Sequence, residues 1–168
     1  MQKTSLPQVK WNLILFTVAF LIIAADQLSK LWVRTNMFPG QSIPESGFFR
    51  LTYAQNTGAA FSIFHGYSDI LAVIASLGVI LILVYIFVLH RHFPFLDTRL
   101  NKIALGMILG GTIGNLIDRI ALGRVTDFID VGPWPIFNIA DSSLVVGVIV
   151  FALSILFASR ESGHGSTK

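Results

Sequence analysis

Four long stretches of the chain are almost continuously apolar, and polar residues gather in the connections between them. The stretches cover residues 12–33, 70–89, 103–121 and 136–158. An α-helix rises about 1.5 Å per residue, so each stretch is long enough to cross a hydrocarbon core of about 30 Å. The pattern predicts an all-α membrane protein whose four transmembrane helices belong to a single integral membrane domain, residues 1–168.

The connection between the first two stretches predicts a small extramembrane β segment, over about residues 40–62. Turn signals precede residues 48–54, which alternate weakly and are rich in Phe, Tyr and Thr, as is typical of a strand. Small or polar residues follow at 56–60, including Gly58, and let a peptide backbone approach closely. One interpretation is a strand edge that binds an extended peptide. The other is an ordinary hairpin that caps the helices.

Composition supports a membrane protein and excludes several classes of site. The chain is 54% hydrophobic and only 12% charged, whereas soluble domains are about 25% charged. The basic residues form no stripe, so we expect no nucleic-acid partner. The chain has no cysteine, and its four histidines lie outside the apolar stretches without paired ligand spacing. We therefore expect no disulfide, no metal site and no cofactor.

The basic residues also predict the orientation of the chain. The extramembrane connections on one side carry only Arg34, Arg50 and Arg124. The flanks on the other side carry more, namely Lys3, Lys10, Arg91, Arg99, Lys102, Arg160 and Lys168. The positive-inside rule then places both termini in the cytoplasm. The β segment and an outward loop over residues 122–135 would lie at the opposite, outer face.

Two acids flank that loop and are the strongest candidates for chemistry. Asp127 follows the third stretch, and Asp141 lies in the first turns of the fourth. Consecutive spans run antiparallel, so the two carboxylates can meet, and acids beside a bilayer are costly unless they are functional. A close pair in a low-dielectric site shares one proton and can act as base and acid together. Such a pair can hydrolyse a peptide bond without a metal or a covalent intermediate.

Other polar side chains within the spans could support the pair. Asn138 lies one turn before Asp141 and could orient it, and Asn115 and Arg119 could do similar work on the third span. Arg119 could instead pair with Asp118 or with a lipid phosphate.

Asp26 and Lys30 are four residues apart, so they share a helix face and can form an ion pair. We expect this pair to face the helix bundle, because an acid exposed to lipid is costly; a local ion pair at the interface is the alternative. The glycines Gly106, Gly110 and Gly114 repeat every four residues, which predicts close helix packing.

The residues alone leave more than one function open. Intramembrane acids also serve proton relays, so a small proton-coupled carrier or a scaffold with buried ion pairs competes with an aspartyl pair. A Ser29–Lys30 dyad is disfavoured, because adjacent residues point to different helix faces.

A resemblance to a known family changes this balance. Five segments resemble the sequence blocks of the lipoprotein signal peptidases, occur in the order of that family and span almost the whole chain. They are DQLSK (26–30), NTGAAFS (56–62), GNLIDR (114–119), VTDFID (125–130) and FNIADSS (137–143).

The resemblance implies a four-span aspartyl protease of the bacterial inner membrane with its active site at the outer leaflet. It implies that the enzyme cuts signal peptides from prolipoproteins just before a diacylglyceryl-modified cysteine. The catalytic pair of the family maps onto Asp127 and Asp141. The supporting residues map onto Asp26, Lys30, Asn56, Asn115, Asp118, Arg119 and Asn138. The partners would be the lipidated substrate and the phospholipid bilayer, and we expect a monomer. A carrier and a non-catalytic lipoprotein-binding scaffold remain the alternatives.

Overall fold

Long helices dominate the structure, which is a computed structural model describing residues 8–58, 68–93 and 97–164. The helices are α1 (Gln8–Asn36), α2 (Ser68–Val84), α3 (Arg99–Leu122) and α4 (Ile139–His164). A π-helical turn, η2 (Tyr85–Leu89), and a 3₁₀ turn, η3 (His90–His92), extend α2. Within the described ranges, four helices are long and apolar enough to cross a membrane. The predicted fold class, a helical membrane protein with a small sheet, is confirmed.

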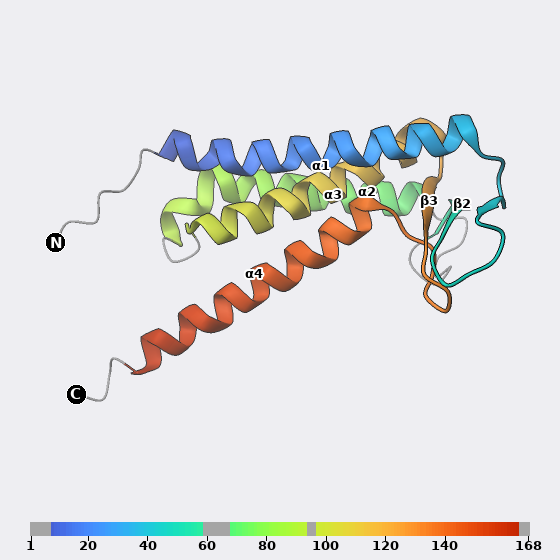
Figure 1. Cartoon of the computed structure of the whole chain (residues 1–168). Coiled ribbons are helices and arrows are strands. Elements are labelled where there is room, and N and C mark those ends of the chain that lie inside the picture. The colour runs from blue at the N-terminus through green and yellow to red at the C-terminus, as the bar shows by residue number, and fades with distance from the viewer. Residues whose placement is uncertain (1–7, 59–67, 94–96, 165–168) are drawn as a thin grey trace.

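The helices form a bundle with the sheet at one end (Figure 1). α3 packs against α1, α2 and α4, and α4 diverges from α1 toward its C-terminal end. The start of α1 and the end of α4 lie at the end of the bundle opposite the strands. Residues that the strands carry therefore lie at a single end of the molecule.

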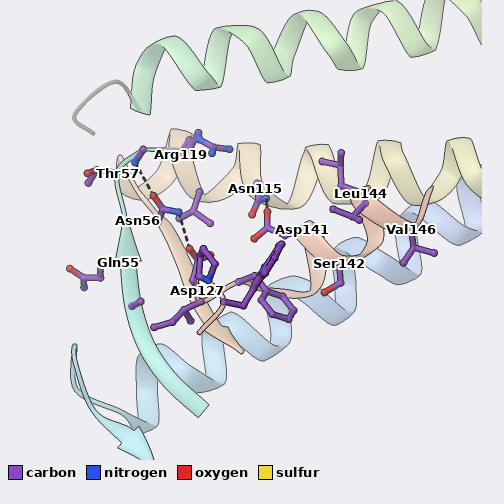
Figure 2. A pocket seen from close by; sticks show the side chains of 18 residues that line it. Gln55, Asn56, Thr57, Asn115, Arg119, Asp127, Asp141, Ser142, Leu144 and Val146 are labelled. Atoms are coloured by element: carbon purple, nitrogen blue, oxygen red, sulfur yellow. Dashed lines mark hydrogen bonds between the residues drawn. The ribbon is translucent and has the colours of Figure 1, made fainter. Parts of the chain in front are cut away.

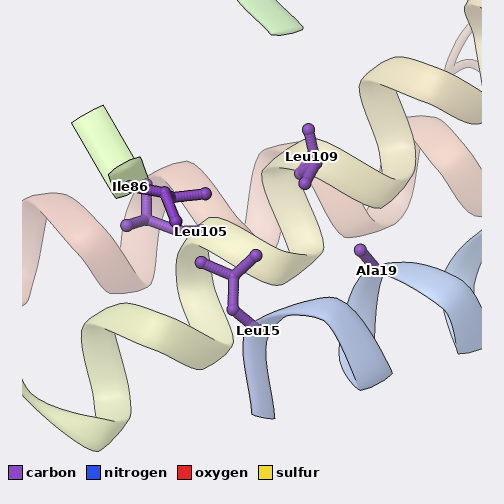
Figure 3. Packing of buried hydrophobic residues seen from close by; sticks show 5 residues of the cluster. All are labelled: Leu15, Ala19, Ile86, Leu105 and Leu109. Carbon is purple, nitrogen blue, oxygen red and sulfur yellow. The ribbon is translucent and has the colours of Figure 1, made fainter. Parts of the chain in front are cut away.

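Glycines allow α3 to approach its neighbours closely, as their spacing predicted. A Cβ atom added at Gly110 would lie 2.8 Å from the carbonyl oxygen of Ala19 on α1, and one at Gly106 would lie 2.7 Å from that of Leu15. Both distances are shorter than any normal contact, so α1 packs directly on the α3 backbone. Beside this contact lies an apolar cluster drawn from α1, η2 and α3 (Figure 3), comprising Leu15, Ala19, Ile86, Leu105 and Leu109.

The sheet joins two segments that are far apart in the sequence. Its antiparallel strands are β1 (Ser42–Ile43), β2 (Arg50–Asn56) and β3 (Val125–Asp130), in the order β1-β2-β3. The pairing of β2 with β3 is irregular between Leu51 and Ala54. The sheet therefore holds the segment after α3 against the segment after α1.

Two predictions about this region are wrong in detail. The strand predicted at residues 48–54 runs two residues later, Arg50–Asn56. The predicted loop at 122–135 contains β3, which the sequence hides because β3 is buried on both faces and shows no alternation. Residues 59–62 of the predicted β segment lie outside the described residues.

The end of α3 and the start of α4 determine where the candidate acids lie. α3 ends at Gly123, whose positive φ of 67° suits glycine, and β3 begins two residues later. α4 begins at Ile139 and not at 136, because Phe137 still bonds to the sheet: its N–H donates to the Ile129 carbonyl at 3.1 Å. Asp127 therefore lies on a strand and Asp141 in the first turn of a helix.

Candidate active site

Asp127 is held on β3 by two amide groups. The side chain is 2% exposed. Asn56 Nδ2, from the end of β2, donates to Asp127 Oδ2 at 2.9 Å, and Asn138 Nδ2 donates to Oδ1 at 2.7 Å. Asn56 is itself oriented by Gly58, whose backbone N–H donates to Asn56 Oδ1 at 2.9 Å. Both carboxylate oxygens of Asp127 thus have a defined direction.

Asp141 is held by a reciprocal cap at the start of α4. The Asp141 N–H donates to Asn138 Oδ1 at 2.9 Å, and the Asn138 N–H donates to Asp141 Oδ2 at 3.3 Å. This is the capping-box arrangement, with an aspartate in the place of the usual glutamate. Asn115 Nδ2 donates to the other oxygen, Oδ1, at 2.7 Å. Asn138 therefore contacts Asp141, for which an orienting role was predicted, and it contacts Asp127 as well.

Both acids line one cavity of about 710 Å³. Figure 2 shows Asp127 and Asp141 directed into the same space, with Asn56 beside the first and Asn115 beside the second. The wall beyond Asp141 is apolar and comes from the first two turns of α4 and the segment before it, namely Trp134, Pro135, Ile136, Phe137, Leu144, Val145 and Val146. The cavity therefore joins a polar, acidic end to a long apolar side.

The surroundings of Asp127 favour its protonated form. Burial raises the pKa of Asp127 to about 7, and the charge of Asp141 acts in the same direction. Hydrogen bonds from Asn56 and Asn138 oppose the rise, because they stabilise the carboxylate. An acid with this pKa still carries a proton near neutral pH, while it faces a second acid.

Beneath the cavity lies a buried network of charges centred on Lys30. The Lys30 side chain is fully buried, and its Nζ lies 2.8 Å from Asp26 Oδ2 and 3.3 Å from Asp118 Oδ2. It also donates to Asn115 Oδ1 at 2.9 Å. Arg34 Nη1 lies 3.4 Å from Asp118 Oδ1 and supplies a second cation. The predicted ion pair of Asp26 and Lys30 therefore faces the bundle.

The two acids of this network also hold the elements that carry the candidate pair. Asp26 Oδ1 accepts the backbone N–H of Ala140 at 3.0 Å, which fixes the start of α4 to α1. Asp118 Oδ2 accepts the backbone N–H of Thr126 at 2.9 Å, which fixes β3 to α3. Each contact is one residue away from Asp141 or Asp127, so the network positions both candidate acids.

Arg119 lies in the wall of the cavity. Among the described residues, the ion pairs of Asp118 are with Lys30 and Arg34, so the suggested pairing with Arg119 is not formed. Arg119 therefore brings positive charge to the cavity that holds the acids. Within the same ranges, no group of three or more His, Asp or Glu side chains could hold a metal ion.

Some contacts of the site were not anticipated. Gln27 Nε2 donates to Asp26, to the Gly114 carbonyl and to Asp118, at 3.1, 3.0 and 3.3 Å. A glutamine inside an apolar span is the signal that could have found it. The apolar wall of the cavity gave no signal, because its residues look like any other membrane-facing helix.

Fold and site together define a class: a multi-pass membrane protein with a paired-acid cavity at one end of its bundle. Comparisons with known proteins identify a family within this class. Residues 18–157 match the family described as signal peptidase (SPase) II. The chain therefore belongs to the signal peptidase II family and is a protease by that membership.

Individual relatives agree with this family. The chain is 53% identical to the lipoprotein signal peptidase of Dehalococcoides mccartyi (strain ATCC BAA-2266 / KCTC 15142 / 195) over 155 residues, 92% of this chain and 96% of the relative. It is 41% identical to that of Moorella thermoacetica over 148 residues, 88% and 95% of the two chains. A solved bacterial membrane enzyme has the same fold, with a TM-score of 0.76, 30% identity and 92% of each chain covered.

Proposed function

We propose that this chain is an aspartyl endopeptidase that removes signal peptides from diacylglyceryl-modified prolipoproteins, cleaving before the lipidated cysteine. Asp127 and Asp141 are the catalytic pair in this proposal. One observation carries it: two acids from different elements share one cavity, and the pKa of the first is raised to about 7. Family membership and the relatives named lipoprotein signal peptidase support the choice of substrate.

The two acids divide the work of hydrolysis. Asp141 starts ionised and takes a proton from a water molecule, whose oxygen attacks the carbonyl carbon of the scissile bond. Asp127 starts protonated and gives its proton to the carbonyl oxygen. When the tetrahedral intermediate collapses, the C–N bond breaks and the proton held by Asp141 passes to the leaving amine. One hydroxyl group of the intermediate returns its proton to Asp127, so both acids regain their starting states. The products are a carboxylic acid and an amine, and no covalent enzyme intermediate forms.

The cavity suits a substrate that is part peptide and part lipid. Its polar end presents Gly58 and Thr57, and Thr57 Oγ1 is buried there without a hydrogen-bond partner among the described residues. A passing peptide backbone can supply that partner. Its apolar side along α4 suits acyl chains or the apolar helix of a signal peptide. Arg119, in the same cavity wall, stabilises the negative charge that develops on the carbonyl oxygen before the proton of Asp127 arrives.

The same geometry supports a location for the proposed activity. The acids lie at the end of the bundle opposite the start of α1 and the end of α4. With the basic flanks facing the cytoplasm, the acids lie at the outer leaflet of the bacterial inner membrane and both termini are cytoplasmic. The cavity lining that the structure describes comes from a single chain, which supports activity as a monomer.

Cleavage of a defined precursor tests the proposal. The purified chain in phospholipid vesicles is given a diacylglyceryl-modified precursor and, separately, the same precursor without the lipid. We expect a gel shift and a product beginning with the lipidated cysteine, by mass spectrometry, only for the modified precursor. Equal cleavage of both precursors would overturn the proposal. Cleavage of neither precursor, together with pH-driven solute flux, would overturn it in favour of a proton-coupled carrier.

A further inference from the structure

The carboxamide of Asn115 stands between the buried charges and Asp141. Its oxygen accepts from Lys30 Nζ at 2.9 Å and from Asn138 Nδ2 at 3.1 Å. Its nitrogen donates to Asp141 Oδ1 at 2.7 Å. The side chain is 6% exposed, and it borders the cavity. Among the described residues, Asn115 is thus the one group that hydrogen-bonds to both the Lys30 ammonium and Asp141.

An amide can turn over without changing its shape, and only its partners decide which end points where. A lysine ammonium can only donate, and an ionised carboxylate can only accept. Turning Asn115 over would set its NH₂ against Lys30 and Asn138 Nδ2 and its oxygen against Asp141, so three contacts would become repulsive. We propose that Lys30 is a positioning residue: it holds the Asn115 oxygen toward itself, so that the Asn115 NH₂ faces Asp141 and keeps Asp141 ionised as the base.

The location of Lys30 explains why it acts through Asn115. Its ammonium is faced by Asp26 from α1 and by Asp118 from α3, with Arg34 beyond Asp118. These groups comprise two positive and two negative charges. Asp141 is faced by Asn115 from α3 and by Asn138 before α4, and Arg119 and Asp127 share its cavity. Within the described residues, the Lys30 side chain forms no hydrogen bond or ion pair with Asp141 or Asp127, and its charge acts on them through space.

This inference rests on the proposed function and predicts how two substitutions combine. Asn115→Ala removes a hydrogen bond to an ionised group, so kcat/KM should fall about 10- to 100-fold. Lys30→Gln should cost a similar factor. If Lys30 acts through Asn115, the double variant should be no more than about threefold worse than the poorer single variant. If the two residues act independently, the loss of kcat/KM in the double variant should equal the product of the two single losses.

The rate–pH profile separates positioning from mere support of the fold. In both single variants the ionised base loses stabilisation, so the acidic limb of the profile should move to higher pH. Lys102→Gln is the matched control. Lys102 is equally buried, and its Nζ lies 2.7 Å from Asp97 Oδ1 just before α3. We expect Lys102→Gln to lower stability and to leave kcat/KM and the acidic limb unchanged.

Asn115→Asp keeps the test decisive if Lys30→Gln does not fold. The new carboxylate still accepts from Lys30 and Asn138, but it faces Asp141 with an oxygen. We expect a loss at least as large as that of Asn115→Ala; a milder loss would overturn the inference, as would multiplied losses or an unmoved acidic limb. Failure of the wild-type chain to cleave the lipidated precursor would instead overturn the proposed function, so the two failures are distinguishable.

Discussion

Asp127 and Asp130 lie three residues apart on β3, and each is 2% exposed, yet their surroundings act on them in opposite directions. Burial raises the pKa of Asp127 to about 7. Burial would also raise the pKa of Asp130, but hydrogen bonds from Thr52 and the Gly132 N–H, together with Arg50, hold it below the usual value. Arg50 Nη2 lies 2.6 Å from Asp130 Oδ2.

The difference between the two acids lies in their neighbours and not in their depth. Asp130 has a cation and a hydroxyl donor, so it stays charged and ties β2 to β3. Asp127 has two neutral amides and faces a second acid, so a proton stays with it. A buried acid without its own cation, beside another acid in a cavity, is the arrangement expected of a catalytic group.

The largest effect should separate the two acids directly. Asp127→Asn removes the proton donor of the proposed pair, so cleavage of the lipidated precursor should fall by about 10³-fold or more. Asp130→Asn should keep activity within about threefold but lower the thermal stability, because a charge-assisted hydrogen bond is lost. Initial cleavage rates and melting temperatures of the two variants check this. Equal loss of activity in both would remove the contrast.

The alkaline limb of the rate–pH profile should follow Asp127. Its pKa is raised, so its proton is held below about pH 7 and lost as the pH rises through that value. We expect kcat/KM to fall above about pH 7. The pKa of Asp127 is higher in the folded chain than in the unfolded chain. The contribution of protonated Asp127 to folding stability is therefore fully present below its unfolded-state pKa, and it is lost as pH rises through about 7. A rate profile that stays flat to pH 9 would contradict the assignment.

Asn56→Ala should move that limb without abolishing activity. The Asn56 amide stabilises the charged form of Asp127, so its removal raises the pKa further. The alkaline limb of the rate–pH profile should move upward by about one pH unit, as expected for one hydrogen bond to a charged group. Gln55→Ala, at the exposed neighbouring position, is the control and should leave the limb in place. A downward shift in Asn56→Ala would show that the amide favours the neutral acid.

The smallest effect concerns the cation of Asp130. Arg50→Gln should raise the pKa of Asp130 and lower the melting temperature by about 2–4 °C, with activity nearly unchanged. The pKa of Asp130 is lowered in the folded chain, so its stabilising contribution is present above the unfolded value and disappears as pH falls. The variant should therefore differ most from the wild type near neutral pH. A large loss of cleavage would show that β2 and β3 matter for more than their own pairing.

Much of this molecule could be predicted from sequence because membrane helices have a strong signal. Apolar runs give the helices, and the glycine repeat at Gly106 and Gly110 gives the contact of α3 with α1. The acids stood out because charged groups are rare in such runs. The start of α4 could not be predicted, since Phe137 belongs to the sheet through its bonds to Ile129.

What the sequence could not supply is the connection between polar residues. Spacing paired Asp26 with Lys30, but it could not reveal that Asp26 also binds the Ala140 N–H or that Lys30 contacts Asn115. Those contacts join residues about 85 to 114 positions apart. β3 was likewise hidden, because a strand buried on both faces has no period-two pattern.

Difference infrared spectroscopy of the carboxyl groups tests most directly whether Asp127 and Asp141 share a proton. Spectra of the wild-type chain in lipid, taken from pH 5 to 9, should contain a neutral carboxyl band that disappears with a midpoint near pH 7. The band should be absent in Asp127→Asn, and its midpoint should fall in Asp141→Asn, because the charge of Asp141 helps to raise the pKa of Asp127. A band already lost at pH 5, or a midpoint that Asp141→Asn does not change, would contradict the shared proton.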